Sequence, residues 1–205
     1  MAQPRAPRAD AVRNRKKILD AAREQITLRG PDAGMDEIAA AAGVAVGTLY
    51  RHFPTKTDLV AAVVAEYTTH VAEAAEAARE RLASGSRAVD EVIGFLAGVT
   101  EATATNHAVK AAARTLGADP VDRDAETRAG TALAALIQAG QADGDIHRDV
   151  TVDDIYLLFS TAPTDQPPAA RARWLTLVLT GLTTHNRTDA TGPRPSPSTA
   201  RADRR

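Results

Sequence analysis

The 205-residue sequence contains no cysteine, and only 3% of its residues are aromatic. Without cysteine there is no disulfide framework, no thiolate nucleophile and no sulfur-based zinc or iron–sulfur site, so a metal ion would need His, Asp and Glu ligands. Because aromatic residues are scarce, the 44% hydrophobic content is mainly Ala, Val, Leu and Ile, which suit close-packed helices better than a β-sandwich. The composition therefore predicts an all-α fold with a sizeable core.

Long hydrophobic runs are absent as well. No stretch reaches the ~18 apolar residues of a membrane span, and the opening MAQPRAPRAD offers no apolar segment before the first expected helix. We therefore expect no membrane partner and, by default, a cytoplasmic location.

Charge is unevenly distributed, although the net charge is only −1. Residues 1–56 hold 10 Lys or Arg against 6 Asp or Glu, a net charge of +4. Residues 57–186 hold 10 against 18, or −8, and residues 187–205 hold 5 against 2, or +3. A basic front on an acidic body favours a polyanionic partner at one end of the molecule. The alternative is a basic arm that is merely solvated.

The two ends of the chain differ in composition from the rest. Residues 1–10 are rich in Pro and Arg, and residues 187–205 are rich in Pro, Ser, Thr and Arg, so we expect a disordered arm and a disordered tail. Between them the apolar periodicity is helical and is interrupted by Gly and Pro, which predicts about nine helices. The first three helices are expected at 11–28, 35–42 and 46–53. The fourth begins at Thr55 and ends at a break at 84–86, the fifth includes 89–99, and the sixth covers 107–116. The seventh includes 129–137, and the last two cover 153–162 and 169–184.

The segment GMDEIAAAAGVAVGTLYRHF, residues 34–53, has the spacing of a helix-turn-helix. Gly43 supplies the permissive backbone that the turn needs, and the small Ala39 lets the two helices approach closely. Leu49 and Phe53 lie four residues apart, on one face of the second helix. The expected buried frame consists of Ile38, Ala39, Val44, Leu49 and Phe53.

The residues outside this frame form a candidate DNA-reading surface. Small residues at the start of the second helix let its end enter a major groove ~12 Å wide and approach base edges or thymine methyl groups. Longer polar side chains near its end, together with Lys56 at the start of the following helix, have the reach to contact phosphates. The alternative is an ordinary three-helix corner with a solvated tyrosine. The expected DNA-binding set is Met35, Ala45, Val46, Gly47, Thr48, Tyr50, Arg51, His52 and Lys56.

The string VAVGTLYRHFPTKTDL closely resembles the recognition helix, and the start of the following helix, of the tetracycline-repressor (TetR-type) family. The resemblance is strong over about residues 11–71 and rests beyond them on architecture and on the segment GDIHRDVTVDD. It implies a helix-turn-helix DNA-binding domain at 11–71 and a helical effector-binding and dimerisation domain at 72–186. One departure is Gly34, where members often place a Thr that caps the helix and touches phosphate, because glycine offers no side chain for either contact.

The resemblance also implies a function and partners. It implies a ligand-responsive repressor that binds an inverted-repeat operator in double-stranded DNA as a homodimer and is released by a small organic effector. The dimer would pair through the last two helices. Helix 169–184 carries one apolar stripe through Trp174 and Leu177 and another through Leu175 and Leu179, so it needs two partners. The alternative is that both stripes are internal core.

The effector would bind among the C-terminal helices. A mostly apolar pocket with a few polar groups suits a small organic ligand, and polar groups on inward helix faces need partners. For that reason Thr103 and His107 stand out among the candidates, and the alternative at each single position is plain core packing. The expected pocket residues are Phe95, Val99, Thr103, His107, Tyr156 and Phe159.

An enzyme is the main rival class. The five histidines lack ligand spacing, and the sequence has neither a GxSxG motif nor a phosphate-cradling glycine loop. Carboxylates between residues 143 and 153 superficially suggest a calcium loop, but Arg148 occupies the position that needs glycine. We therefore expect no catalytic residue, no metal site and no cofactor. The alternative is a helical small-molecule-binding protein or enzyme whose basic N-terminus is only a solvated face.

Overall fold

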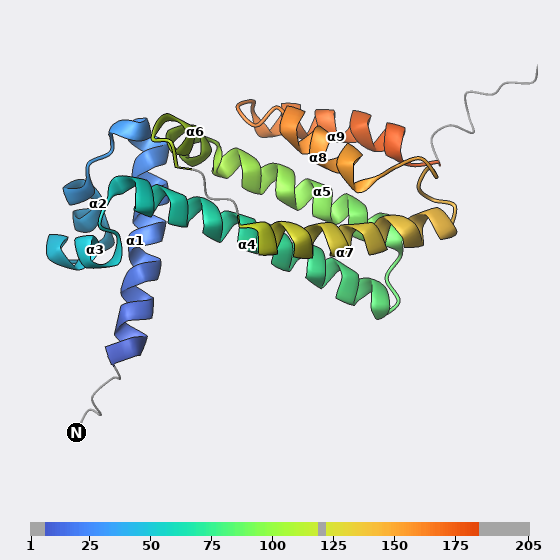
Figure 1. The fold of residues 1–205 in the computed structure, drawn as a ribbon. Helices are drawn as coiled ribbons and strands as arrows, with labels where there is room; N and C mark the ends of the chain where they lie inside the picture. The colour runs from blue at the N-terminus through green and yellow to red at the C-terminus, as the bar shows by residue number, and fades with distance from the viewer. Residues whose placement is uncertain (1–6, 119–121, 185–205) are drawn as a thin grey trace, which may run out of the picture.

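The computed structural model describes residues 7–118 and 122–184, and within these ranges the fold is all-α, as the composition predicts (Figure 1). In this part of the chain, extended backbone pairs only in one isolated bridge between Ile146 and Thr183. The elements in chain order are α1 (Pro7–Arg29), the short 3-10 helix η1 (Gly30–Asp32), α2 (Met35–Ala42), α3 (Val46–His52), α4 (Lys56–Ala83), α5 (Ala88–Thr105), α6 (His107–Thr115), α7 (Arg123–Ala142), α8 (Val152–Thr161) and α9 (Pro168–Leu182).

The first helix is longer than the sequence suggests. α1 begins at Pro7, so the last four residues of the expected disordered arm are helical. Proline is tolerated in the first turn because the N–H that it lacks would have no partner there, and Asp10 forms an ion pair with Arg13 one turn later. The rest of the expected arm, 1–6, and the expected tail, 187–205, lie outside the described residues.

Two hydrophobic clusters form the core, and they divide within α4. The first cluster joins α1, α2, α3 and the start of α4 as far as Val64. The second begins at Ala72 and joins the rest of α4 to α5, α7, α8 and α9. Figure 1 shows α4 running from the helix-turn-helix into the bundle, where it lies beside α5 and α7. A single long helix therefore connects the two parts of the molecule.

α6 crosses this division. Its place in the sequence puts it in the expected C-terminal domain, 72–186, yet Val109, Ala112 and Ala113 are buried in the first cluster, where α6 contacts α1 and η1. These three residues lie on one face because positions three and four apart in a helix are neighbours. The N-terminal helices therefore share their core with a helix from the C-terminal half.

α8 and α9 leave an apolar face uncovered. Ile155 is the only buried residue of α8, and Leu182 is the only buried residue of α9. Leu157 and Leu177 are 62% and 57% exposed, although leucine is among the residue types most often buried. In Figure 1 the two helices lie together along the outer side of α5. They thus present apolar side chains away from the bundle.

Candidate functional site

The helix-turn-helix forms at the predicted residues. The turn between α2 and α3 contains Gly43, whose φ of 64° lies in the left-handed region that favours glycine. The guanidinium of Arg15 on α1 lies 5.4 Å from the centre of the Phe53 ring, a cation–π contact that fixes the end of α3. The sequence pattern gave no sign of this contact. The predicted frame is buried, with Ile38, Ala39, Leu49 and Phe53 inside the first cluster and Val44 packed against it.

The outer face of α3 is open to solvent, and Figure 1 shows the helix at the edge of the molecule. Val46 and Tyr50 are 41% and 45% exposed, unusually high values for large hydrophobic side chains. A Cβ atom added to Gly47 would meet nothing within 4 Å, so the start of the helix is bare. The structure places Ala45, Val46, Gly47, Tyr50 and Arg51 of the expected set on the exposed surface, and leaves Thr48 and His52 half-buried.

Two members of the expected DNA-binding set have internal contacts. Met35 is half-buried and packs against the first cluster. The ammonium of Lys56 donates a hydrogen bond to the carbonyl of Pro31, which ties the start of α4 to η1. An ammonium has three donors, so this bond leaves donors of Lys56 for an anion. Met35 offers no polar group, and its placement here is structural.

At the start of α2, a side chain inside the helix accepts a hydrogen bond from the backbone of the N-cap residue, whereas in the usual cap the N-cap side chain accepts a bond from the helix backbone. Gly34 has no side chain to accept a bond, but its N–H donates to the Glu37 carboxylate at 3.0 Å. Glu37 also forms an ion pair with Arg29. Its pKa lies below the ordinary range, first because of the bond from Gly34 and then because of Arg29. Half of the reciprocal cap is therefore present, and the half that a Thr side chain would supply is missing.

Most basic residues of α1 have acidic neighbours, whereas the cation of α3 does not. Lys16 lies 3.1 Å from Asp20, and Arg13 pairs with Asp10. Among the described residues no ion pair is formed by Arg51, which is exposed beside Tyr50. An exposed guanidinium without a carboxylate partner is free to contact a phosphate or a base edge.

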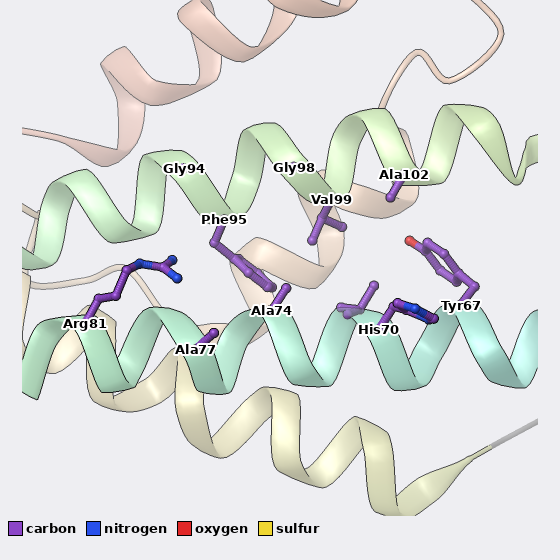
Figure 2. A pocket seen from close by; sticks show the side chains of 11 residues that line it. Tyr67, His70, Ala74, Ala77, Arg81, Gly94, Phe95, Gly98, Val99 and Ala102 are labelled. Atoms are coloured by element: carbon purple, nitrogen blue, oxygen red, sulfur yellow. The ribbon is translucent and has the colours of Figure 1, made fainter.

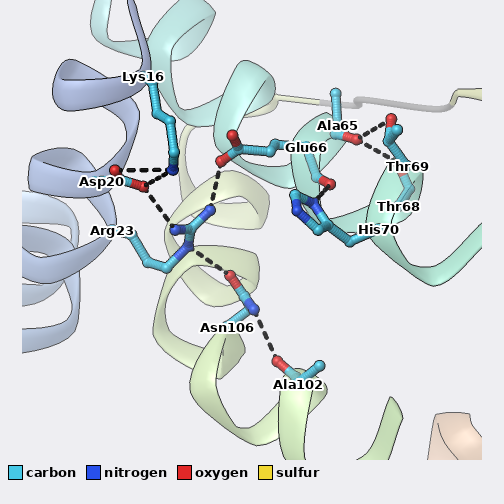
Figure 3. Close-up of polar contacts among 10 residues, drawn as sticks. All are labelled: Lys16, Asp20, Arg23, Ala65, Glu66, Thr68, Thr69, His70, Ala102 and Asn106. Carbon is cyan, nitrogen blue, oxygen red and sulfur yellow. Dashed lines mark hydrogen bonds and ion pairs between the residues drawn. The ribbon is translucent and has the colours of Figure 1, made fainter. Parts of the chain in front are cut away.

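A polar bridge connects α1 to the C-terminal helices (Figure 3). Arg23 donates to the Glu66 carboxylate on α4 at 2.6 Å and to the side-chain oxygen of Asn106 at 3.2 Å. Asn106, which stands between α5 and α6 and is only 8% exposed, donates in turn to the Ala102 carbonyl at 2.8 Å. The bridge makes the position of α1 depend on α4 and on the junction between α5 and α6.

A groove of about 270 Å³ lies between α4 and α5, and Figure 2 shows side chains of the two helices facing each other across it. Its walls are largely small residues, among them Ala74 on α4 and Gly94 and Gly98 on α5. Of the expected pocket residues, Phe95 and Val99 line it. The groove exists because these positions carry little or no side chain.

A second cavity, of about 180 Å³, lies on the α7 and α8 side of the same helices and has a lining that is mostly apolar. Of the expected pocket residues it brings together Val99, Thr103, Tyr156 and Phe159. Phe159 also meets Phe95 edge to face, with ring centres 6.2 Å apart. The expected residues thus come from two neighbouring hollows that share Val99.

The cavity contains polar groups that sequence reasoning missed. The hydroxyl of Tyr67 lies 2.6 Å from that of Thr103, and both residues are buried. Burial raises the pKa of Tyr67, and the bond to Thr103 partly offsets the rise. Lys110 on α6 lines the same cavity. No local signal in the sequence marks Tyr67 or Lys110 as a cavity residue, because Tyr67 falls at the same helical spacing as the apolar residues Leu59, Val63 and Val71.

His107 does not line either hollow. Its Nδ1 lies 2.8 Å from the hydroxyl of Thr164, in the loop between α8 and α9, and the residue is exposed. The reason is the orientation of α6: because the helix turns Val109 and Ala112 into the first cluster, its first residue points to the surface. The structure therefore does not bring His107 together with the other expected pocket residues.

The described residues hold no group of three or more His, Asp or Glu side chains that could bind a metal ion. In the same ranges, no helix is both long enough and apolar enough to span a membrane.

Comparison with known proteins gives one consistent result for both halves of the chain. Residues 18–63 match the family model described as bacterial regulatory proteins of the tetR family. Residues 88–184 match the model for the C-terminal domain of SbtR-like transcriptional regulators. The two matches leave residues 64–87, which include most of α4, between them.

Curated relatives match over less than half of this chain. The HTH-type transcriptional repressor LfrR of Mycolicibacterium smegmatis is 37% identical over 93 residues, which is 45% of this chain and 47% of the relative. The uncharacterized HTH-type transcriptional regulator TtgW of Pseudomonas putida is 45% identical over 58 residues, 28% of this chain and 43% of the relative. The chain thus spans less than half the length of these two relatives.

Solved structures match over most of the chain. A TetR transcription regulatory protein from Mycobacterium vanbaalenii has a TM-score of 0.69 and 29% identity, with 87% of this chain and 100% of that chain covered. A TetR transcriptional regulator from Streptomyces coelicolor has a TM-score of 0.65 and 28% identity, with 83% and 99% covered. The likeness therefore extends from the helix-turn-helix through the C-terminal helices.

Proposed function

Because this chain belongs to the tetR family of bacterial regulatory proteins, we propose that it is a DNA-binding transcriptional regulator, a homodimeric repressor that a small organic effector releases from its operator. Repression is supported by the relative LfrR, whose name describes a transcriptional repressor. A regulator of this kind acts where the bacterial chromosome is, so we also propose a cytoplasmic location. It has no catalytic role in this proposal and needs no cofactor.

The observation that carries the proposal is the bare, exposed start of α3. Ala45, Val46 and Gly47 leave the helix end without bulk, so its backbone can approach base edges in the major groove. Tyr50 and Arg51 flank this end and have the length to reach the DNA backbone. Lys56 keeps donors available at the N-terminus of α4, where the helix dipole favours an anion. The half-buried Thr48 and His52 complete the contact set.

Dimerisation through α8 and α9 supplies the second recognition helix. Leu157 and Leu177 border a hollow between the two helices and would be buried by the same face of a second copy, as a two-fold interface requires. Two copies of α3 would then enter successive major grooves ~34 Å apart and read an inverted repeat.

Release of the protein from DNA by an effector is supported by α6, which belongs both to the cavity and to the core of the N-terminal helices. α6 contributes Lys110 to the cavity and Val109 to the core of the helix-turn-helix domain. A ligand that shifts α6 or the adjoining α4 would move that core and change the separation of the two recognition helices. Coupling between two such sites is typically ~1–3 kcal/mol, enough to weaken DNA binding ~5–150-fold.

The test is selection of bound sequences from random duplex DNA by the full-length protein. We expect enrichment of an inverted repeat, and we expect the Tyr50→Ala, Lys56→Ala double variant to bind the selected site much more weakly at moderate salt. Enrichment of an unpaired half-site would contradict the dimer. No enrichment at all would contradict the regulator and return the chain to the alternative of a helical ligand-binding protein or enzyme with a solvated basic end.

A further inference from the structure

Lys110 occupies an unusual position for a lysine. It is half-buried on α6, lines the 180 Å³ cavity, and places its ammonium 4.2 Å from the centre of the Tyr67 ring. Lysine is seldom buried unless its charge is paired. The ring face of Tyr67 attracts the cation but carries no net charge, so it replaces only part of the hydration that burial removes.

The charge of Lys110 has no carboxylate partner among the described residues. Burial lowers the pKa of Lys110, and the positive charge of Arg114 one turn along α6 lowers it further. Glu126 also lines the cavity but lies near α8, where its charge is among the causes that raise the pKa of Tyr156, after burial. The cavity is therefore positive at the α6 end and negative at the α8 end.

The space beside Lys110 is apolar and small. Val71, Val99, Ala129 and Phe159 contribute aliphatic and aromatic surface, and the neighbouring Tyr67 and Thr103 hydroxyls bond to each other. A cavity of ~150 Å³ in an engineered protein core accepts one benzene molecule. The present cavity, of about 180 Å³, accommodates one ring with a short substituent.

We propose that this cavity binds an effector consisting of a single aromatic or alicyclic ring that carries a carboxylate, and that Lys110 pairs with the carboxylate. The inference rests on the proposed function, since it names the chemical class of the effector. The ring lies against Val71, Val99 and Phe159, and the acid group points to α6. A charge-assisted bond from a partly desolvated ammonium is stronger than the same bond in water. The cavity should therefore bind a ring that carries a carboxylate more tightly than a neutral ring of the same size.

The first experiment compares ligands on the unmodified full-length protein by isothermal titration calorimetry. The probes are benzoate, phenylacetate and cyclohexanecarboxylate, with benzamide and benzyl alcohol as neutral counterparts of similar size. We expect at least one acid to bind about tenfold or more tightly than the neutral compounds. Equal binding of acids and neutral compounds, or no binding of any acid at millimolar concentration, would overturn the proposal. This comparison needs no variant and therefore does not depend on variant folding.

The second experiment locates the charge. Lys110→Met keeps the length of the side chain and removes its charge, and we expect it to weaken acid binding about 10–100-fold while leaving binding of neutral rings unchanged. Lys110→Arg should restore most of the acid affinity. Arg114→Met is the matched control, because it removes a like charge from the same helix at an exposed position that does not line the cavity. Retention of acid binding by Lys110→Met, or its loss in Arg114→Met alone, would overturn the proposal.

These measurements separate the two hypotheses. Calorimetry reports on the cavity whether or not the protein binds DNA, and selection from random DNA reports on the helix-turn-helix whether or not an acid binds. An operator that is found but is insensitive to acids that bind the cavity would contradict their role as effectors, while leaving the regulator intact.

Discussion

Arg23 on α1 and Glu66 on α4 form an ion pair at 2.6 Å, and both side chains are about three-quarters shielded from solvent, with 26% and 21% of their surface exposed. The pair joins the first helix of the helix-turn-helix domain to the helix that continues into the ligand-binding part. Arg23 also donates a hydrogen bond to the side chain of Asn106, between α5 and α6, which is a second attachment of α1. Because the partners come from different elements, the pair constrains the angle between α1 and α4.

Replacing Glu66 by Gln should therefore destabilise the protein by about 1–2 kcal/mol, since it removes the closer of two carboxylates that pair with the shielded guanidinium and leaves only Asp20 on α1, at 3.4 Å. Denaturant unfolding followed by circular dichroism measures the change. Glu80→Gln is the control, because Glu80 is an exposed carboxylate on the same helix and its loss should change stability by less than about 0.5 kcal/mol. If the two variants unfold at the same denaturant concentration, the pair does not constrain α1.

Stability should also fall in acid. The carboxyls of Glu76, Glu91 and Glu101 have pKa values below their ordinary 4.5 because Arg128, Arg81 and Arg171, respectively, donate hydrogen bonds to them. Lowered folded-state pKa values mean that the unfolded chain binds more protons, so stability rises with pH through this range. The contribution is therefore fully present above 4.5 and is lost as the pH falls through the lowered values.

Urea unfolding midpoints measured from about pH 7 down to about pH 3 test this. We expect a plateau followed by a decline that begins near the ordinary pKa of 4.5. Glu76→Gln should lower the plateau and make the decline shallower, because the variant lacks the ion pair between Glu76 and Arg128 at every pH, including neutral pH. A midpoint that stays constant into acid would show that these pairs add nothing to stability.

The helix-turn-helix could be predicted from sequence because local signals define it. Gly43 ends α2 and supplies the positive φ of the turn between α2 and α3, and the spacing of Leu49 and Phe53 marks the buried face of α3 without reference to any distant residue. The start of α1 at Pro7 was not predicted, because proline is permitted both in a first helical turn and in an irregular arm.

The cavity could not be predicted in the same way, because its residues come from five helices. Periodicity shows that α6 has a buried face but not which core receives it, and that choice decides whether His107 or Lys110 lines the cavity. Tyr67 likewise fits an apolar stripe. Its contacts with Thr103 and Lys110 depend on the packing of α4 against α5 and α6.

The uncovered face of α8 and α9 gives a prediction about assembly. A glutamate at Leu157 or Leu177 would be buried without a partner in the proposed dimer, and two-fold symmetry would place two such charges in one interface. We expect either variant to raise the dimer dissociation constant by at least about 100-fold, the equivalent of ~3 kcal/mol. Leu28→Glu is the control, since Leu28 is a still more exposed leucine, 70% accessible, on α1. Sedimentation equilibrium should find it dimeric, and a dimeric Leu157→Glu variant would contradict the assigned interface.

The exposed guanidinium of Arg51 gives a prediction about the salt dependence of DNA binding. Each phosphate that a protein neutralises contributes about 0.9 to the slope of log affinity against log salt concentration, because bound counterions are released. A dimer has two Arg51 side chains, so Arg51→Gln should make the slope less steep by about 2 if each contacts one phosphate. Fluorescence anisotropy over a range of salt concentrations measures both slopes on the selected operator.

Arg79→Gln is the control, because it removes an exposed arginine from the part of α4 that lies in the bundle. Its slope should match that of the unmodified protein. Weaker binding of the Arg51 variant with an unchanged slope would instead place this side chain on a base edge, and the loss of affinity would then be confined to operators that carry that base.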